Sequence, residues 1–116
     1  MDRKKELKEL YKTMKPDMGV FIIRSNSDDK YFIQATPNLK GKINSVKFQL
    51  EGGVFVNREL QREWKEKGES AFTIEILEKL EYDKDESKTD YSEELELLKM
   101  IWEERLANKG MKAYGK

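Results

Sequence analysis

The stretch LQREWKEKGESAF at residues 60–72 decides the fold of this chain. Leu60 and Trp64 are separated by one helical turn, which predicts a short helix with one apolar face. Gly68 ends this helix, because glycine tolerates the backbone conformation that follows a last helical turn. From Phe72 onward apolar and polar residues alternate, with Phe72, Ile74 and Ile76 set against Thr73 and Glu75, and this period predicts a half-buried strand.

Two earlier segments predict a hairpin. Residues 18–23 (MGVFII) are apolar at every side-chain position, as expected for a strand that is covered on both faces. Residues 25–29 (SNSDD) form a turn cluster, and residues 30–33 (KYFI) return as the second strand.

Two helices are predicted between the hairpin and the third strand. Thr36 is expected to cap the first, with Pro37 as its first residue, where proline loses no hydrogen bond. Its apolar face recurs every three or four residues, at Leu39, Ile43, Val46 and Leu50. Gly52-Gly53 ends this helix, and Asn57 caps the next.

The remaining segments supply two more helices. After an acidic connection anchored by Leu80 and Tyr82, Asp90 with Glu93 resembles a capping box for a final helix that ends at residues 108–110. Its predicted packed residues are Leu95, Leu98, Ile101, Trp102 and Leu106. At the other end, Leu7, Leu10, Tyr11 and Met14 predict an added amphipathic helix before Pro16. We therefore expect an α+β domain at residues 16–116, with a three-stranded antiparallel sheet flanked by helices, and an extra helix at residues 1–15.

Composition excludes several kinds of chemistry. A chain of 116 residues is the size of one domain. It has no cysteine and no histidine, which excludes disulfides, thiolate metal sites and catalysis by serine–histidine or cysteine–histidine pairs. No apolar run is long enough for a transmembrane helix or a secretory signal, so a cytoplasmic protein is expected.

Charge is balanced overall but uneven along the chain. The 23 basic and 23 acidic residues cancel, whereas residues 1–50 carry 11 Lys/Arg against 6 Asp/Glu, and residues 78–96 carry 3 against 9. A basic front half suits a phosphate backbone, although a charged fraction of 40% also serves simply to solvate a small domain.

The pattern resembles the GIY-YIG nuclease family over residues 18–114, and the spacing of residues 60–72 looks like that of a bacterial subgroup. The resemblance rests on the Gly19-Val20-Phe21 strand, the interval from Phe21 to Phe32, the helix entry at residues 36–39 and the residue 60–72 block. It implies the fold described above and a metal-dependent endonuclease site.

In that family two tyrosines, an arginine, often a histidine, and a metal-binding glutamate surround the scissile phosphate. The resemblance places these roles at Phe21, Phe32, Lys42, Val46 and Lys99. Phenylalanine lacks the hydroxyl, valine moves no proton, lysine lacks the guanidinium fork, and a lysine at the metal ligand's position repels a metal. These replacements predict a degenerate site with no catalytic residue and no bound metal or other cofactor.

Neighbouring residues could replace the missing hydroxyl and the missing metal ligand. Tyr31 adjoins Phe32, but its hydroxyl would reach the site only if the strand pairing slipped by one residue. Glu96 and Glu103 lie within about a turn of Lys99, so Mg²⁺ is expected only if a site is rebuilt around one of them.

Three functional interpretations follow. The first is a non-enzymatic pseudo-enzyme that binds DNA or other nucleic acid weakly through Lys40, Lys42, Lys47, Arg58 and Arg62. The second is a protein-interaction module that meets a partner or a second copy of the chain. The third is an active endonuclease with a relocated metal ligand.

Overall fold

A mixed four-stranded sheet forms the centre of the molecule. The computed structural model describes residues 15–115, whose elements are β1 (Met18–Ser25), β2 (Lys30–Thr36), α2 (Leu39–Gly52), α3 (Arg58–Lys67), the 3₁₀ turn η1 (Glu69–Ala71), β3 (Phe72–Leu80), α4 (Ser92–Asn108) and β4 (Lys112–Ala113). The strand order is β3-β1-β2-β4. The three long strands are antiparallel as predicted, and the structure adds β4, which pairs parallel to β2. The α+β fold class is confirmed.

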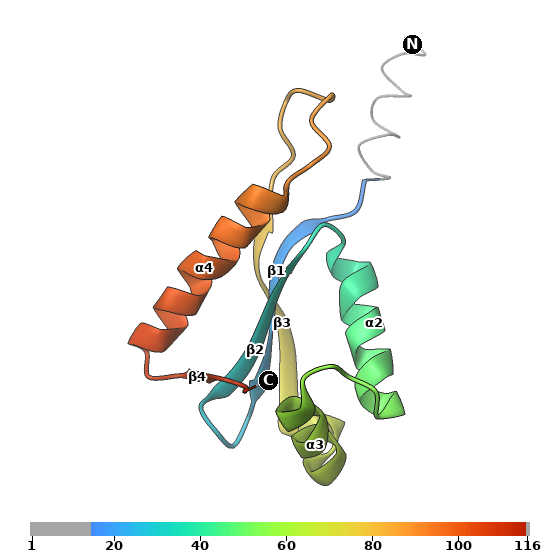
Figure 1. Cartoon of the computed structure of the whole chain (residues 1–116), viewed down its shortest axis with the longest axis vertical. Coiled ribbons are helices and arrows are strands. Elements are labelled where there is room, and N and C mark those ends of the chain that lie inside the picture. The colour runs from blue at the N-terminus through green and yellow to red at the C-terminus, as the bar shows by residue number, and fades with distance from the viewer. Residues whose placement is uncertain (1–14, 116) are drawn as a thin grey trace.

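Helices cover both faces of the sheet because β1 is apolar on both sides. Phe21 and Ile23 pack with α2 and α3 on one face, in the cluster that also holds Leu60 and Trp64. Val20 and Ile22 point the other way and pack with Leu106 of α4. Figure 1 shows the result, with α2 and α3 on one side of the strands and α4 on the other. The sheet therefore divides the molecule into two layers.

The last part of β3 keeps the predicted alternation but not the predicted burial. Leu77 packs on the α4 side, opposite Phe72 and Ile74, and the pairing of β1 with β3 shifts register between Val20 and Phe21. Ile76 is 46% exposed, and the expectation that it would be buried is wrong. The physical reason is that β3 is an edge strand and α2 packs chiefly against β1, which leaves this end of β3 partly uncovered.

Helix α2 starts two residues later than predicted. Thr36 belongs to β2, and the N-cap is Asn38, whose Oδ1 accepts a hydrogen bond from the Gly41 amide at 3.0 Å. The Thr36 hydroxyl oxygen instead accepts from the Asn38 amide at 3.1 Å. The ladder with β1 extends to Thr36 and holds it in the strand. The predicted end of α2 is confirmed, with Gly53 in the left-handed conformation.

The ends of the other helices are mostly as predicted. Asn57 caps α3 by accepting from the Leu60 amide at 3.1 Å, and Gly68 follows its last turn. The predicted capping box is wrong, since the N-cap of α4 is Tyr91 and its side chain makes no capping bond. Asp90 lies one residue too early and accepts from the Ser92 amide instead.

The segment between β3 and α4 contacts Pro16 and Met18, at the start of the described residues. Leu80 and Tyr82 pack beside Met18 and Tyr91, and the Tyr82 hydroxyl donates to the Pro16 carbonyl oxygen at 2.6 Å. The predicted apolar anchors of the acidic connection are thereby confirmed. Of the added helix predicted at residues 1–15, all but the last residue lies outside the described residues. Within residues 15–115 no helix is both long and apolar enough to span a bilayer.

Candidate nucleic-acid interface

Three of the five positions that the resemblance assigns to a nuclease site lie together on the α2–α3 side of the sheet. Phe21 has no exposed surface and Val46 is 1% exposed, and both belong to the core under α2 and α3. Phe32 is partly buried against the same core, and its ring meets Phe55 edge-on with centroids 5.2 Å apart. Phe21 and Phe32 therefore serve as packing residues, and neither ring carries a polar group that could meet a phosphate.

The other two positions are separated from each other. Lys42 lies half-buried on α2, in the layer of Phe21 and Val46. Lys99 lies on α4, which covers the opposite face of the sheet (Figure 1). The structure thus does not bring the five positions together, because the sheet lies between α2 and α4.

The possible substitutes also lie on the α4 side. Arg24 pairs with Tyr31 and Ile23 with Phe32, so the strand pairing is not slipped. Tyr31 is buried beneath α4, and this burial, followed by the negative charge of Glu103, raises the pKa of its hydroxyl. The hydroxyl consequently stays protonated at neutral pH and faces away from Phe32.

The residues present do not fit the metal that the resemblance implies. A divalent metal needs several hard oxygen ligands, and the described residues contain no group of three or more acidic side chains that could hold one. Glu96 is exposed and Glu103 half-buried, both on α4, with Lys99 between them in sequence. We therefore assign no metal-dependent step to this chain.

The five basic residues proposed to contact phosphate occupy the α2–α3 layer but not one continuous patch. Lys40 and Lys47 are seven positions apart, so they share a flank of α2, whereas Lys42 lies about 160° around the helix from Lys40. Arg58 and Arg62 are four residues apart and both are exposed on α3. Among residues 15–115 none of the five forms a salt bridge. Their charges remain available to an external anion.

An ionic cluster around one buried carboxylate was not anticipated from the sequence. Glu63 is 6% exposed, and its carboxylate lies 3.1 Å from Lys67 Nζ and 3.6 Å from Lys30 Nζ. Lys67 also binds Asp28 at 2.9 Å, which lowers the pKa of that carboxyl. The spacing of Glu63 and Lys67, four residues apart on a helix, is the signal that could have revealed the first pair. The cluster ties α3 to the hairpin turn.

Comparison with known proteins supports the fold. The chain resembles the solved catalytic domain of the homing endonuclease I-TevI, with a TM-score of 0.64 and 20% sequence identity over 85% of this chain and 99% of that one. It also resembles a mutant of the catalytic domain of the intron endonuclease I-TevI, with a TM-score of 0.65 and 19% identity over 85% of this chain and 92% of that one. No family model and no curated protein sequence matches the chain. Because the I-TevI catalytic domain is a GIY-YIG nuclease, the fold of this chain is GIY-YIG-like.

Proposed function

We propose that this chain is a nucleic-acid-binding module on a nuclease-like scaffold and that it does not cleave what it binds. One observation carries the proposal: the α2–α3 layer keeps surface cations without ion-pair partners among residues 15–115, while Phe21 and Val46 fill the reactive positions of that layer as core residues. Phosphate contacts need only such cations, whereas cleavage needs oxygen or nitrogen groups that can move a proton or hold a metal.

The binding should be modest and strongly salt-dependent. Each phosphate neutralised on a duplex lowers the logarithm of the affinity by about 0.9 per tenfold increase in salt. If all five cations made such contacts, the slope would be about −4.5. The protein has no net charge, so no long-range attraction adds to these local contacts.

We expect the protein to retard DNA at low salt without nicking it. Purified protein is incubated with supercoiled plasmid and with single-stranded DNA across a titration of magnesium and manganese, and one gel reports both mobility and nicking. Reversing two of the charges, Lys42→Glu with Arg62→Glu, should abolish the retardation. These residues lie on different helices of the proposed interface, so each helix loses one positive charge and gains a negative one.

The matched control is Lys84→Glu with Lys109→Glu. It makes the same change of net charge at two exposed residues outside the α2–α3 layer. DNA retardation that persists in the Lys42 and Arg62 variant would refute the assigned interface. Retardation that is lost equally in the control variant would refute it as well. Nicking that disappears on changing Glu96 or Glu103 would instead support a nuclease with a relocated ligand.

A second candidate function is the pairing of two copies through α4. Leu97 and Met100 are 59% and 57% exposed, and Ile101, which we predicted to be packed, is 39% exposed beside them. Spacings of three and four residues place them on one stripe of the helix. The first turn of α4 carries Glu93 and Glu94 and its last turn carries Arg105, so antiparallel pairing of two such helices would set opposite charges against each other.

We expect this second function to appear as a dimer in gel filtration with light scattering. Replacing Leu97 by glutamate should convert the dimer to a monomer, because it places a charge in the middle of the apolar contact. Leu97 is exposed, so the folded monomer tolerates the change. A wild-type protein that remains monomeric at high concentration would exclude the pairing.

A further inference from the structure

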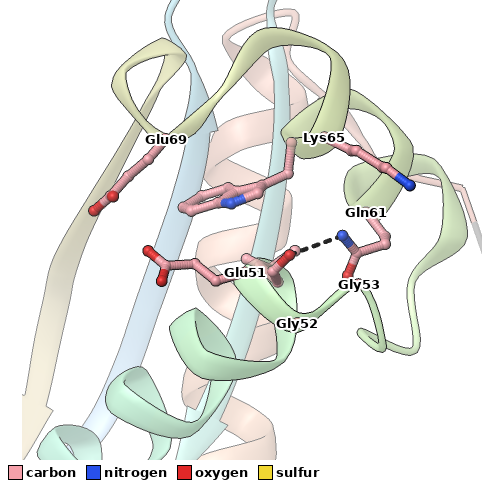
Figure 2. A pocket seen from close by; sticks show the side chains of 8 residues that line it. Glu51, Gly52, Gly53, Gln61, Lys65 and Glu69 are labelled. Carbon is pink, nitrogen blue, oxygen red and sulfur yellow. Dashed lines mark hydrogen bonds between the residues drawn. The ribbon is translucent and has the colours of Figure 1, made fainter.

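A surface cavity of about 390 Å³ lies where the end of α2 meets α3 and η1. Two carboxylates from different elements reach it, Glu51 of α2 and Glu69 of η1. Figure 2 shows both carboxylates directed to the same side of the cavity, while the ammonium of Lys65 points away from them. None of the five basic residues assigned above to phosphate lines this cavity.

The local charge of this cavity is negative. Within residues 15–115 neither Glu51 nor Glu69 forms a salt bridge. Helix α2 ends at Gly52 with no basic residue in its last turn, so the negative end of its dipole is also uncompensated there. These charges favour a cationic ligand and repel a phosphate group.

One residue that lines this cavity has an unused hydrogen-bond donor. Trp64 lines the cavity and is only 5% exposed, yet among residues 15–115 its indole N–H has no hydrogen-bond partner. The nitrogen is not among the fully enclosed unpartnered atoms, so a ligand can still reach it. By contrast, the neighbouring Gln61 amide is committed, because it donates to the Leu50 carbonyl oxygen at 2.9 Å. A donor without a protein partner can donate to an acceptor that a ligand supplies.

The indole is also held in place before any ligand arrives. Its ring stacks on Phe72, with centroids 5.1 Å apart and an interplanar angle of 24°. A ligand that matches the cavity must therefore present a cation to two carboxylates and an acceptor to a fixed N–H group. A basic residue within a peptide carries both, since its peptide carbonyl oxygen accepts hydrogen bonds.

We propose that this cavity binds a lysine or arginine residue of a peptide, with its cation between Glu51 and Glu69 and a peptide carbonyl oxygen accepting from Trp64 Nε1–H. Two sources can supply this chemistry. One is a basic segment of another protein, and the other is the run Arg3-Lys4-Lys5 of the chain itself. The inference does not depend on nucleic-acid binding.

The test uses the two indole N–H signals of the full-length protein in ¹H–¹⁵N NMR spectra, assigned with Trp102→Phe. Nα-acetyl-arginine amide is titrated at low salt, with uncharged Nα-acetyl-citrulline amide as the matched probe. The Trp64 signal should shift saturably with the arginine probe and respond at least tenfold more weakly to citrulline. The Trp102 signal should stay in place, because its N–H already donates to Glu78 at 3.0 Å.

Variants then identify the groups and the source. Glu51→Gln with Glu69→Gln should weaken arginine binding at least tenfold, whereas Glu66→Gln with Glu104→Gln, an equal charge change at exposed residues outside the cavity, should not. Arg3→Ala with Lys4→Ala and Lys5→Ala shifts the Trp64 signal of the free protein if the chain's own segment occupies the cavity. If it does not shift while the added probe still binds, the ligand belongs to another protein. The proposal is wrong if the Trp64 signal shifts neither with the arginine probe nor in the Arg3, Lys4 and Lys5 variant. It is also wrong if the arginine probe binds equally well after Glu51 and Glu69 are replaced.

Discussion

Replacing Gly19 by alanine is expected to lower the free energy of unfolding by about 3 kcal/mol. Gly19 is buried in β1, where an added Cβ would overlap the backbone carbonyl oxygen of Glu78 and lie 2.8 Å from Lys79 Cα. Both obstacles are backbone atoms of the paired strand, which cannot rotate away as a side chain would. The strands must separate locally, and the ladder between β1 and β3 is weakened. Urea denaturation followed by circular dichroism would measure the loss.

Gly52→Ala is the matched control for this prediction. Gly52 lies within α2, and a Cβ there would meet only Val54 Cγ2, at the ordinary contact distance of 3.9 Å. Alanine loses less backbone entropy in a helix than glycine does, so this variant should be unchanged or more stable by up to about 1 kcal/mol. A Gly19→Ala protein as stable as the wild type would show that β1 and β3 do not approach as closely as described here.

Replacing Tyr114 by alanine is expected to cost about 3 kcal/mol of unfolding free energy, because it empties a large site in the core. Tyr114 is 6% exposed and packs in the cluster under α2 and α3. Its amide donates to the Tyr31 carbonyl oxygen at 2.8 Å, next to the short strand β4. The side chain therefore anchors the end of the chain to the sheet, and its loss should also expose β4. Hydrogen exchange at the Tyr114 amide would detect that local opening.

Tyr114→Phe separates the ring from its hydroxyl. The hydroxyl is buried without a well-formed hydrogen bond to any described residue, so its removal should leave the protein at neutral pH as stable as before or slightly more stable. Burial raises the pKa of Tyr114 from 10.0 to about 12. Because this folded-state pKa is raised, the wild type should lose stability as the pH rises from 10 through 12. The phenylalanine variant should lose less over that interval, and equal losses in the two proteins would contradict the assignment.

Local sequence signals were sufficient for most of the secondary structure. The apolar run of β1 predicted a strand covered on both faces, and Asn57, Gly53 and Gly68 marked helix ends that the structure confirms. These features depend on neighbouring residues alone, through side-chain period and backbone conformation. The error at Thr36 arose because Asn38 caps the helix while strand pairing holds Thr36, and the error at Asp90 arose because α4 starts one residue later, after Tyr91.

The candidate site was predicted only in part. The sequence indicated that Phe21, Phe32 and Val46 lack reactive groups, and their placement together on one face follows from strand and helix periods. The separation of Lys99 from them was not predictable, since it depends on which face of the sheet α4 covers after a long connection. The cavity between Glu51 and Glu69 was likewise invisible in the sequence, because 17 intervening residues must fold before these carboxylates meet.

By itself, the sequence determined the identity and order of the long strands and the helices described here, the chemistry available at each position and the absence of cysteine and histidine. Each of these is a property of single residues or of spacings within one element. Only the tertiary structure decided the parallel β4 pairing, the exposure of Ile76 and Ile101, the burial of Glu63 among lysines, and the placement of α4 on the face of the sheet opposite α2 and α3. These depend on contacts between residues far apart in the chain, which the packing of helices against a shared sheet selects and local spacing does not encode.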